Sequence, residues 1–189
     1  MEFQKDIENC LHVLQAGGLI LYPTDTIWGI GCDATDPDAV KKVFDCKQRQ
    51  ETKSLIVLLA DERDLLKYVS QADLHIFDFL HKAKKPTTVI YEGAIGLAQN
   101  LVAEDGTIAI RIVKDPFCKH LIKRFRKPLV STSANLSGEP APRFFAEITR
   151  DIRLGVDYIV QYRQGDHAIK EPSAIIRWNK DGTHTVIRP

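Results

Sequence analysis

Several signals that would place this chain in a familiar class are missing from its sequence. None of the four cysteines forms a C-x-x-C pair, and the six histidines show no regular ligand spacing with them, so we expect no structural zinc site. Unpaired thiols suit a reducing compartment better than a disulfide framework does. No stretch approaches the roughly 20 apolar residues of a membrane span, and residues 1–6 lack the basic start of a signal peptide. These absences indicate a soluble, cytoplasmic protein with no membrane partner.

An excess of charge of one sign is also missing. Lys and Arg total 26 and Asp and Glu total 25, a formal net charge of +1. This balance argues against a protein that coats nucleic acid by charge alone, although it is compatible with a local basic pocket. The 189 residues are 44% apolar and 27% charged, without an internal repeat or a linker, so we expect one globular domain over residues 1–189.

Familiar nucleotide-binding and hydrolase motifs are absent. No G-x-x-x-x-G-K-[ST] occurs, which excludes a P-loop, and no G-x-S-x-G occurs, which argues against serine hydrolase chemistry at Ser133. Residues 29–34 match the dinucleotide fingerprint loosely. However, the next helix signal begins after them, at Asp36 and Pro37, so these glycines do not open the helix that would hold a pyrophosphate.

The order of the expected helices and strands indicates an α/β protein. The continuous apolar run over residues 55–59 predicts a strand that is buried on both faces. The helical spacing of Ile7, Leu11 and Leu14 predicts a first helix that stops at Gly17-Gly18. We expect further helices from Pro37, near 61–69, 72–83 and 115–125, and after Pro142, and strands at 19–22, 87–91, 108–112, 128–130 and 158–161. Residues 173–178 and 183–188 predict a closing hairpin. Helices that alternate with strands before a final hairpin favour a mixed sheet.

Three polar segments are candidates for a binding site. Residues 22–31 follow a strand and carry hydroxyls, a carboxylate and two glycines, as a small-molecule site at a strand end requires. Residues 47–54 hold three cations that could bind phosphate, and residues 131–138 hold four hydroxyls and an amide that could bind a nucleotide. Each segment also has a plain structural interpretation: a turn, a solvated charged loop and a helix cap, respectively.

Taken together, these segments resemble the YrdC/TsaC family of threonylcarbamoyl-adenylate synthases. The resemblance also includes two shorter stretches, residues 86–88 and 110–111, and residues 172–176 near the end of the chain. The pieces occur in the family's order and span nearly the whole chain. The resemblance implies an α/β fold in which a twisted mixed β-sheet, flanked by helices, surrounds a large concave basic cavity, in the short single-domain form.

The resemblance also implies roles for individual residues. Lys47 and Arg49 would be catalytic and would face the nucleotide. The remaining ATP-binding residues would be Lys53, Thr88, Ser133, Asn135 and Arg188. The threonine substrate would contact Thr26, Ser131 and Ser173, and the pocket would also include Arg111 and Ser137.

The reaction that the resemblance implies is a nucleotidyl transfer. L-Threonine, bicarbonate or CO2, and ATP would give threonylcarbamoyl-adenylate and pyrophosphate, for the N6-threonylcarbamoyladenosine at position 37 of tRNA. We expect Mg²⁺ on the ATP phosphates rather than a metal held by the protein. The macromolecular partners would be tRNA, including its double-stranded regions, and the machinery that transfers the threonylcarbamoyl group.

Three departures from the family pattern leave other functions open. Gln50 stands where the family usually has proline, Lys84 and Lys85 replace part of a Pro-Gly-Pro, and Ala141 replaces a small polar residue. A YciO-like paralogue and a non-catalytic RNA-binding protein are the alternatives. Retention of Lys47-x-Arg49 favours the synthase. All of this depends on Arg49 and Asn135 lying on the same hollow.

Overall fold

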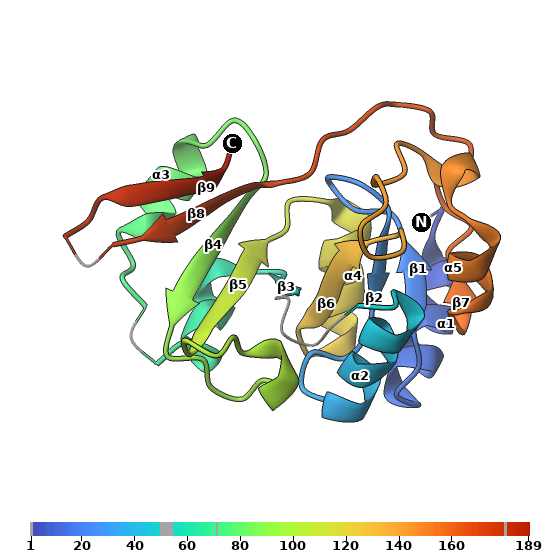
Figure 1. Ribbon diagram of the computed structural model, residues 1–189, viewed down its shortest axis with the longest axis horizontal. Coiled ribbons are helices and arrows are strands. Elements are labelled where there is room, and N and C mark those ends of the chain that lie inside the picture. Colours follow the sequence, from blue (N-terminus) through green and yellow to red (C-terminus); the bar gives the residue numbers. More distant parts are fainter. Residues whose placement is uncertain (1, 50–54, 71, 180) are drawn as a thin grey trace.

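The computed structural model describes residues 2–49, 55–70, 72–179 and 181–189, which form one twisted nine-stranded sheet (Figure 1). The strand order is β7-β1-β2-β6-β3-β5-β4-β8-β9. Pairs β1–β7, β3–β5 and β4–β8 are parallel and the others are antiparallel, so the mixed sheet is confirmed. The strands are β1 (Ile20–Tyr22), β2 (Gly29–Gly31), β3 (Ile56–Leu59), β4 (Thr87–Glu92), β5 (Thr107–Ile112), β6 (Leu129–Ser133), β7 (Tyr158–Ile159), β8 (Ala174–Trp178) and β9 (His184–Arg188).

Helices flank this sheet, and two of them begin at Asp-Pro signals. Asp36 accepts hydrogen bonds from the backbone of Asp38 and Ala39 at the start of α2, and Asp115 accepts one from Cys118 at the start of α4. Each aspartate is followed by the proline that favours the first helical turn. The helices are α1 (Gln4–Gln15), α2 (Pro37–Cys46), α3 (Ile76–Lys82), α4 (Pro116–Phe125) and α5 (Arg150–Leu154), with short 3-10 helices η1 (Glu62–Lys67), η2 (Gln99–Leu101) and η3 (Phe145–Glu147).

The core of the first half of the sheet is dense because two strands approach closely. Tyr22 on β1 is fully buried and donates a hydrogen bond from its hydroxyl to the carbonyl of Val130 on β6, at 3.0 Å. A Cβ at Gly31, on the strand between them, would lie 2.5 Å from the Val130 oxygen and 2.6 Å from the Tyr22 ring. Glycine at position 31 therefore allows Tyr22 to reach across β2.

The structure differs from the sequence-based expectations at four places. Residues 22–31 contain a short strand, β2, that the many turn-forming residues concealed. Residues 61–69 form a 3-10 helix instead of an α-helix, and α3 is shorter than expected. The helix expected after Pro142 starts only at Arg150, because η3 and its flanking extended backbone come first. Within the described ranges, no helix has the length and apolarity needed to cross a bilayer.

Candidate functional site

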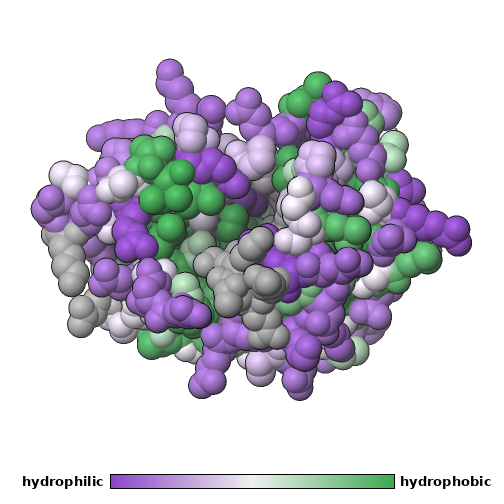
Figure 2. Space-filling view, viewed as in Figure 1, coloured by the Kyte–Doolittle hydropathy of each residue, from purple (hydrophilic) through white to green (hydrophobic). Residues whose placement is uncertain are grey.

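A hollow near the middle of the sheet brings the three polar segments together (Figure 2). This central cavity has a volume of about 370 Å³ and receives residues from β2, β3, β5 and β6, and from the two ends of the closing hairpin. Eight of the residues chosen from the sequence line it: Thr26, Arg49, Arg111, Ser131, Ser133, Asn135, Ser173 and Arg188. Arg49 and Asn135 thus share one cavity, as the sequence-based hypothesis required.

Strand β6 supplies the hydroxyl-rich wall of the central cavity. Ser131 and Ser133 are two residues apart and so point to the same face. Across the ladder, Ser133 is paired with Gly29, and a Cβ at Gly29 would lie 3.2 Å from the Ser131 hydroxyl oxygen. The absence of a side chain at Gly29 therefore leaves these serines open to the cavity.

The end of α2 turns Lys47 and Arg49 in different directions. Gln48 has a left-handed backbone, with φ of 50°. The backbone N–H of Arg49 donates to the carbonyl of Phe44 at 2.9 Å, and that of Gln48 donates to Asp45 at 3.0 Å. These are the two bonds of a Schellman motif, which normally has glycine at the left-handed position. The motif ends the helix and sends Arg49 toward the cavity.

Lys47 lies behind the cavity wall rather than on it. Its side chain is only 1% exposed, and its ammonium group donates to the backbone carbonyls of Ser133 and Asn135, the latter at 2.5 Å. The Lys47 carbonyl in turn accepts from the backbone N–H of Ser137 at 2.9 Å. Burial, with a smaller effect from the charge of Arg49, lowers the pKa of Lys47 to about 8, so the amine stays protonated at neutral pH. Lys47 therefore ties the end of α2 to the segment that follows β6.

Three arginines, Arg49, Arg111 and Arg188, line the central cavity. Burial lowers the pKa of Arg49, and burial together with the charge of Arg111 lowers the pKa of Arg188. Arg111 is 3% exposed, and its Nη2 lies 3.1 Å from Oδ1 of Asp25, in an ion pair without hydrogen-bond alignment. Its Nε has no hydrogen-bond partner within the described part of the chain. Guanidinium groups held together in this way favour an anionic ligand.

Hydroxyl networks fix two threonines around the central cavity. The Thr24 hydroxyl donates to the carbonyl of Ile27 at 2.8 Å, so it must accept the proton of the Thr26 hydroxyl at 2.9 Å. The lone pairs of Thr26 then remain available to a ligand. On the opposite wall, Thr88 is fully buried and shares a 2.8 Å hydrogen bond with the Ser173 hydroxyl.

The structure does not place every residue of the sequence-based set on the cavity wall. Lys47, Thr88 and Ser137 are not part of the lining, and they reach it only through Ser133, Asn135 and Ser173. Lys53 lies outside the described residues, as does Gln50. The roles assigned to all of these residues, and the basic character of the cavity as a whole, stay predictions.

Three kinds of lining residue were not selected from the sequence. Trp28, 6% exposed, lines the cavity and packs its ring 4.9 Å from that of Phe145. Glu139 adds a carboxylate to the lining, and Ala141, one of the three departures, is also part of the wall. The aliphatic floor comes from β3, β4, β5 and β8 and consists of Ile56, Ile90, Ala109 and Ile175. Because successive side chains of a strand point to opposite faces, the position of each residue along its strand could have indicated that it faces the cavity.

The side chains fit a metal ion that is carried on a ligand better than one held by the protein. Across the described ranges, no group of three or more His, Cys, Asp or Glu side chains could hold a metal ion. Within the central cavity the carboxylate of Glu139 is accompanied by hydroxyl and amide oxygens only. Mg²⁺ that arrives with a nucleotide would therefore find phosphate oxygens as its main ligands.

Comparisons with known proteins give a consistent result over most of the chain. The family model of Sua5, YciO and YrdC, described as "Telomere recombination", matches residues 12–189. A protein of Vibrio campbellii named threonylcarbamoyl-AMP synthase is 35% identical over 176 residues, which cover 92% of this chain and 94% of that protein. A protein of Pseudoalteromonas translucida with the same name is 34% identical over 178 residues, covering 93% and 94% of the two chains.

Solved structures share the fold at lower sequence identity. P. abyssi Sua5, in complex with L-threonine, superposes with a TM-score of 0.85 at 22% identity, over 98% of this chain and 54% of that one. E. coli YciO superposes with a TM-score of 0.83 at 24% identity, over 98% and 89% of the two chains.

Proposed function

Since the chain belongs to the Sua5/YciO/YrdC family, we propose that it is a threonylcarbamoyl-AMP synthase that acts in the t6A modification of tRNA. Its substrates would be L-threonine, bicarbonate or CO2, and ATP. The observation that carries this proposal is the convergence of Arg49, Arg111 and Arg188 with Ser133 and Asn135 on one cavity. The relatives that carry this name support the proposal, because the similarity to this chain covers 94% of each of them.

The arginines are suited to the phosphates of ATP. Negative charge accumulates on the α-phosphate and on the departing pyrophosphate during adenylate formation, and fixed cations lower the energy of that charge. Arg49 and Arg188 lie in a cavity where burial limits competition by water, so their charges act at reduced dielectric. In this proposal Lys47 acts differently from Arg49: it positions Ser133 and Asn135, and its charge reaches the phosphates only from behind the wall.

The hydroxyl wall is suited to an amino acid. Thr26 offers acceptor lone pairs, and Ser131 and Ser173 offer hydroxyl groups at two other points of the same cavity. Three directional contacts can orient one small substrate, which addresses the entropic cost of joining three reactants. The related P. abyssi Sua5 binds L-threonine, which supports the same ligand here.

The proposed chemistry needs two bond-forming steps. The neutral amine of threonine attacks CO2, forms a C–N bond and gives up a proton, which leaves a carbamate. A carbamate oxygen then attacks the α-phosphorus of ATP, and the bond from that phosphorus to the bridging oxygen of pyrophosphate breaks. Mg²⁺, when it is bound to the phosphates, would neutralise part of their charge. The side chains of the cavity would orient the reactants and stabilise the developing charge.

The proposal can be tested by incubating the purified protein with ATP, L-threonine and bicarbonate, and detecting the adenylate by mass spectrometry. Omission of any one substrate should abolish the product, and pyrophosphate should appear in equal amount. Replacement of threonine by serine tests the contacts of the hydroxyl wall. If ATP is not consumed in the presence of all three substrates and Mg²⁺, the chain is not a synthase.

A further inference from the structure

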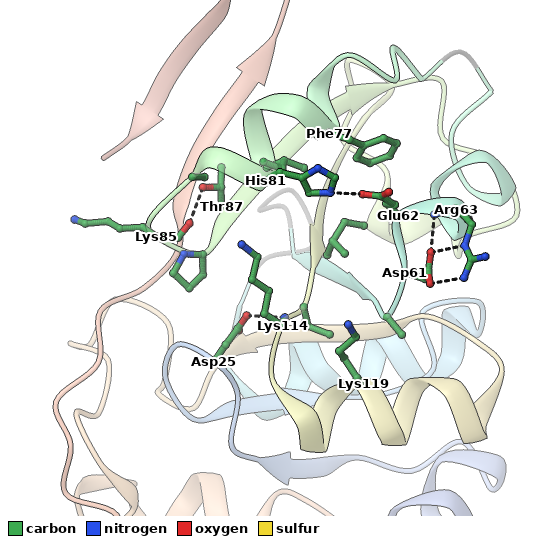
Figure 3. A pocket seen from close by; sticks show the side chains of 16 residues that line it. Asp25, Asp61, Glu62, Arg63, Phe77, His81, Lys85, Thr87, Lys114 and Lys119 are labelled. Carbon is green, nitrogen blue, oxygen red and sulfur yellow. Dashed lines mark hydrogen bonds and ion pairs between the residues drawn. The ribbon is translucent and has the colours of Figure 1, made fainter.

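A second cavity lies outside the central one and has no part in the proposed reaction (Figure 3). It has a volume of about 420 Å³ and lies between α3, the start of η1, and the loop that leads into α4. We call it the α3–α4 cavity. Asp25, in its lining, also interacts with the central cavity through its ion pair with Arg111.

Most charged side chains around the α3–α4 cavity have a polar partner. Asp61 receives two hydrogen bonds from the Arg63 guanidinium, each of 2.9 Å. Glu62 and His81 lie 2.9 Å apart, and Lys85 lies 3.2 Å from Glu171 outside the cavity. Asp25, as described, faces Arg111. Each carboxylate of this lining therefore has a polar partner other than the ammonium groups of Lys114 and Lys119.

Two lysines of this lining, Lys114 and Lys119, form no ion pair with another described residue. Lys114 precedes the cap of α4, and Lys119 is in its first turns. Figure 3 shows both ammonium groups pointing into the cavity, toward the side formed by α3. Two ammonium groups that share one concave space attract an anion more strongly than isolated surface lysines do.

The rest of the lining is apolar and includes a ring. Phe77 and Leu80 on α3 are half-buried, and Ile112 and Val113 come from the end of β5 and the loop after it. Pockets of several hundred Å³ with an apolar wall and a few charged groups are typical of sites for small organic ligands. A flat group could lie against Phe77 while a charged group meets the lysines.

We propose that the α3–α4 cavity binds a small phosphate monoester with a flat apolar group, of the size of a nucleoside monophosphate. A phosphate monoester carries between one and two negative charges at neutral pH, which two ammonium groups match better than they match a carboxylate. Lysine is a common phosphate ligand because it acts as a compact point charge. Such a ligand would contact both the lysines and the apolar wall, whereas inorganic phosphate would contact only the lysines.

The test is a titration followed by NMR at His81, whose imidazole lies in this lining and whose signal is identified by its loss in His81→Gln. AMP, adenosine and inorganic phosphate are the probes. The central cavity is a competing site for AMP, so the titration is repeated in Arg49→Met. The double variant Lys114→Met/Lys119→Met removes both charges, and Lys123→Met, also on α4 but outside this cavity, is the matched control.

We expect AMP to shift the His81 signal to saturation in the wild type and in Arg49→Met, and adenosine not to shift it over the same range. The double variant should weaken AMP binding by about tenfold or more, and Lys123→Met should not. Three results would each overturn the proposal: no AMP-dependent shift at His81, unchanged affinity in the double variant, or inorganic phosphate binding as tightly as AMP. Adenylate synthesis, measured on the same samples, reports on the proposed function separately.

Discussion

The two cavities are similar in volume but are built from different parts of the molecule. The central cavity, of about 370 Å³, is formed largely by strands and takes its charge from three arginines, of which Arg111 is 3% exposed. The α3–α4 cavity, of about 420 Å³, is formed mainly by helices and loops, and its lining includes Lys114 and Lys119, which form no ion pair with another described residue. Arg111 and Arg188 lie on strands and can hold phosphates at set angles, whereas Lys114, in the loop before α4, and Lys119, on α4, provide point charges on flexible side chains.

The central cavity also has a supporting layer of hydrogen bonds behind its wall. Lys47, Thr88 and Thr24 each hold a lining residue from behind, through hydrogen bonds to Ser133, Ser173 and Thr26 respectively. A catalytic site needs this support because small displacements of the reactants cost large factors in rate. This support agrees with our proposals that adenylate formation takes place in the central cavity and that the α3–α4 cavity binds a ligand.

The largest expected effect is on the rate of adenylate formation, which should depend on the central cavity and not on the α3–α4 cavity. Arg49→Met should lower the rate of adenylate formation by about 10²-fold or more, the usual cost of removing one group that stabilises transition-state charge. Lys114→Met, the corresponding change in the α3–α4 cavity, should stay within about twofold because it leaves the lining of the central cavity intact. The rates of adenylate formation of the two variants and of the wild type are measured with saturating ATP, threonine and bicarbonate. Equal losses in both variants would contradict the assignment.

The next effect concerns the support behind the central cavity. Lys47→Met removes the buried donor to the carbonyls of Ser133 and Asn135, of which the Ser133 carbonyl still accepts from the backbone N–H of Asn135, so we expect the free energy of unfolding to fall by about 1–3 kcal/mol. Adenylate formation should fall as well, since the segment that follows β6 loses its anchor. Urea denaturation measures the first effect, with Lys123→Met as an exposed control. A variant with full stability would show that the ammonium group is not a structural tie.

The third effect tests the close strand approach under the central cavity. Gly31→Ala places a methyl group 2.5 Å from the Val130 carbonyl, so Tyr22 or β6 must move, at a cost of about 1–3 kcal/mol. Gly165→Ala is the control, because no atom lies within 4 Å of the position that its Cβ would occupy. Thermal unfolding of the two variants gives the comparison, and similar midpoints would argue against close packing at β2.

The smallest effect is a gain in stability at the turn that directs Arg49. Gln48→Gly should raise the free energy of unfolding by about 1 kcal/mol, because glycine adopts a left-handed backbone without steric cost. Gln48→Ala should bring no such gain, since alanine keeps the Cβ. The denaturation midpoints of Gln48→Gly and Gln48→Ala, each compared with that of the wild type, measure these effects. Lower stability in Gln48→Gly would mean that a contact of the Gln48 side chain stabilises the fold by more than its left-handed backbone destabilises it.

Much of the fold could be predicted from local patterns because each pattern has a local cause. Asp36 and Asp115 start helices through contacts with their own neighbours, and the apolar run over 55–59 forms the buried strand β3. Strand β2 could not be predicted this way, because Gly29 and Gly31 carry no side-chain pattern. Their place is decided by Ser131 and Tyr22, which are distant in sequence or lie on another strand.

In the site, too, the residue types could be predicted from the sequence, but the directions of the side chains could not. Residue types and the family resemblance selected Arg49, Ser133 and Asn135, which lie on one cavity. The sequence did not reveal that Lys47 points away from the cavity surface, because that depends on the left-handed Gln48 and on carbonyls more than eighty residues away. The α3–α4 cavity had no sequence signal at all, since its two lysines resemble any surface lysines until α3 is placed opposite them.

The most direct test of the central claim is whether ATP binds next to Trp28. The chain has two tryptophans, so Trp178→Phe leaves Trp28, which lines the central cavity, as the one source of tryptophan fluorescence. We expect ATP to change this fluorescence to saturation, and Arg49→Met to remove the change. If calorimetry shows ATP binding that leaves Trp28 unchanged and is lost in Lys114→Met/Lys119→Met, ATP occupies the α3–α4 cavity and the assignment of the two cavities is wrong.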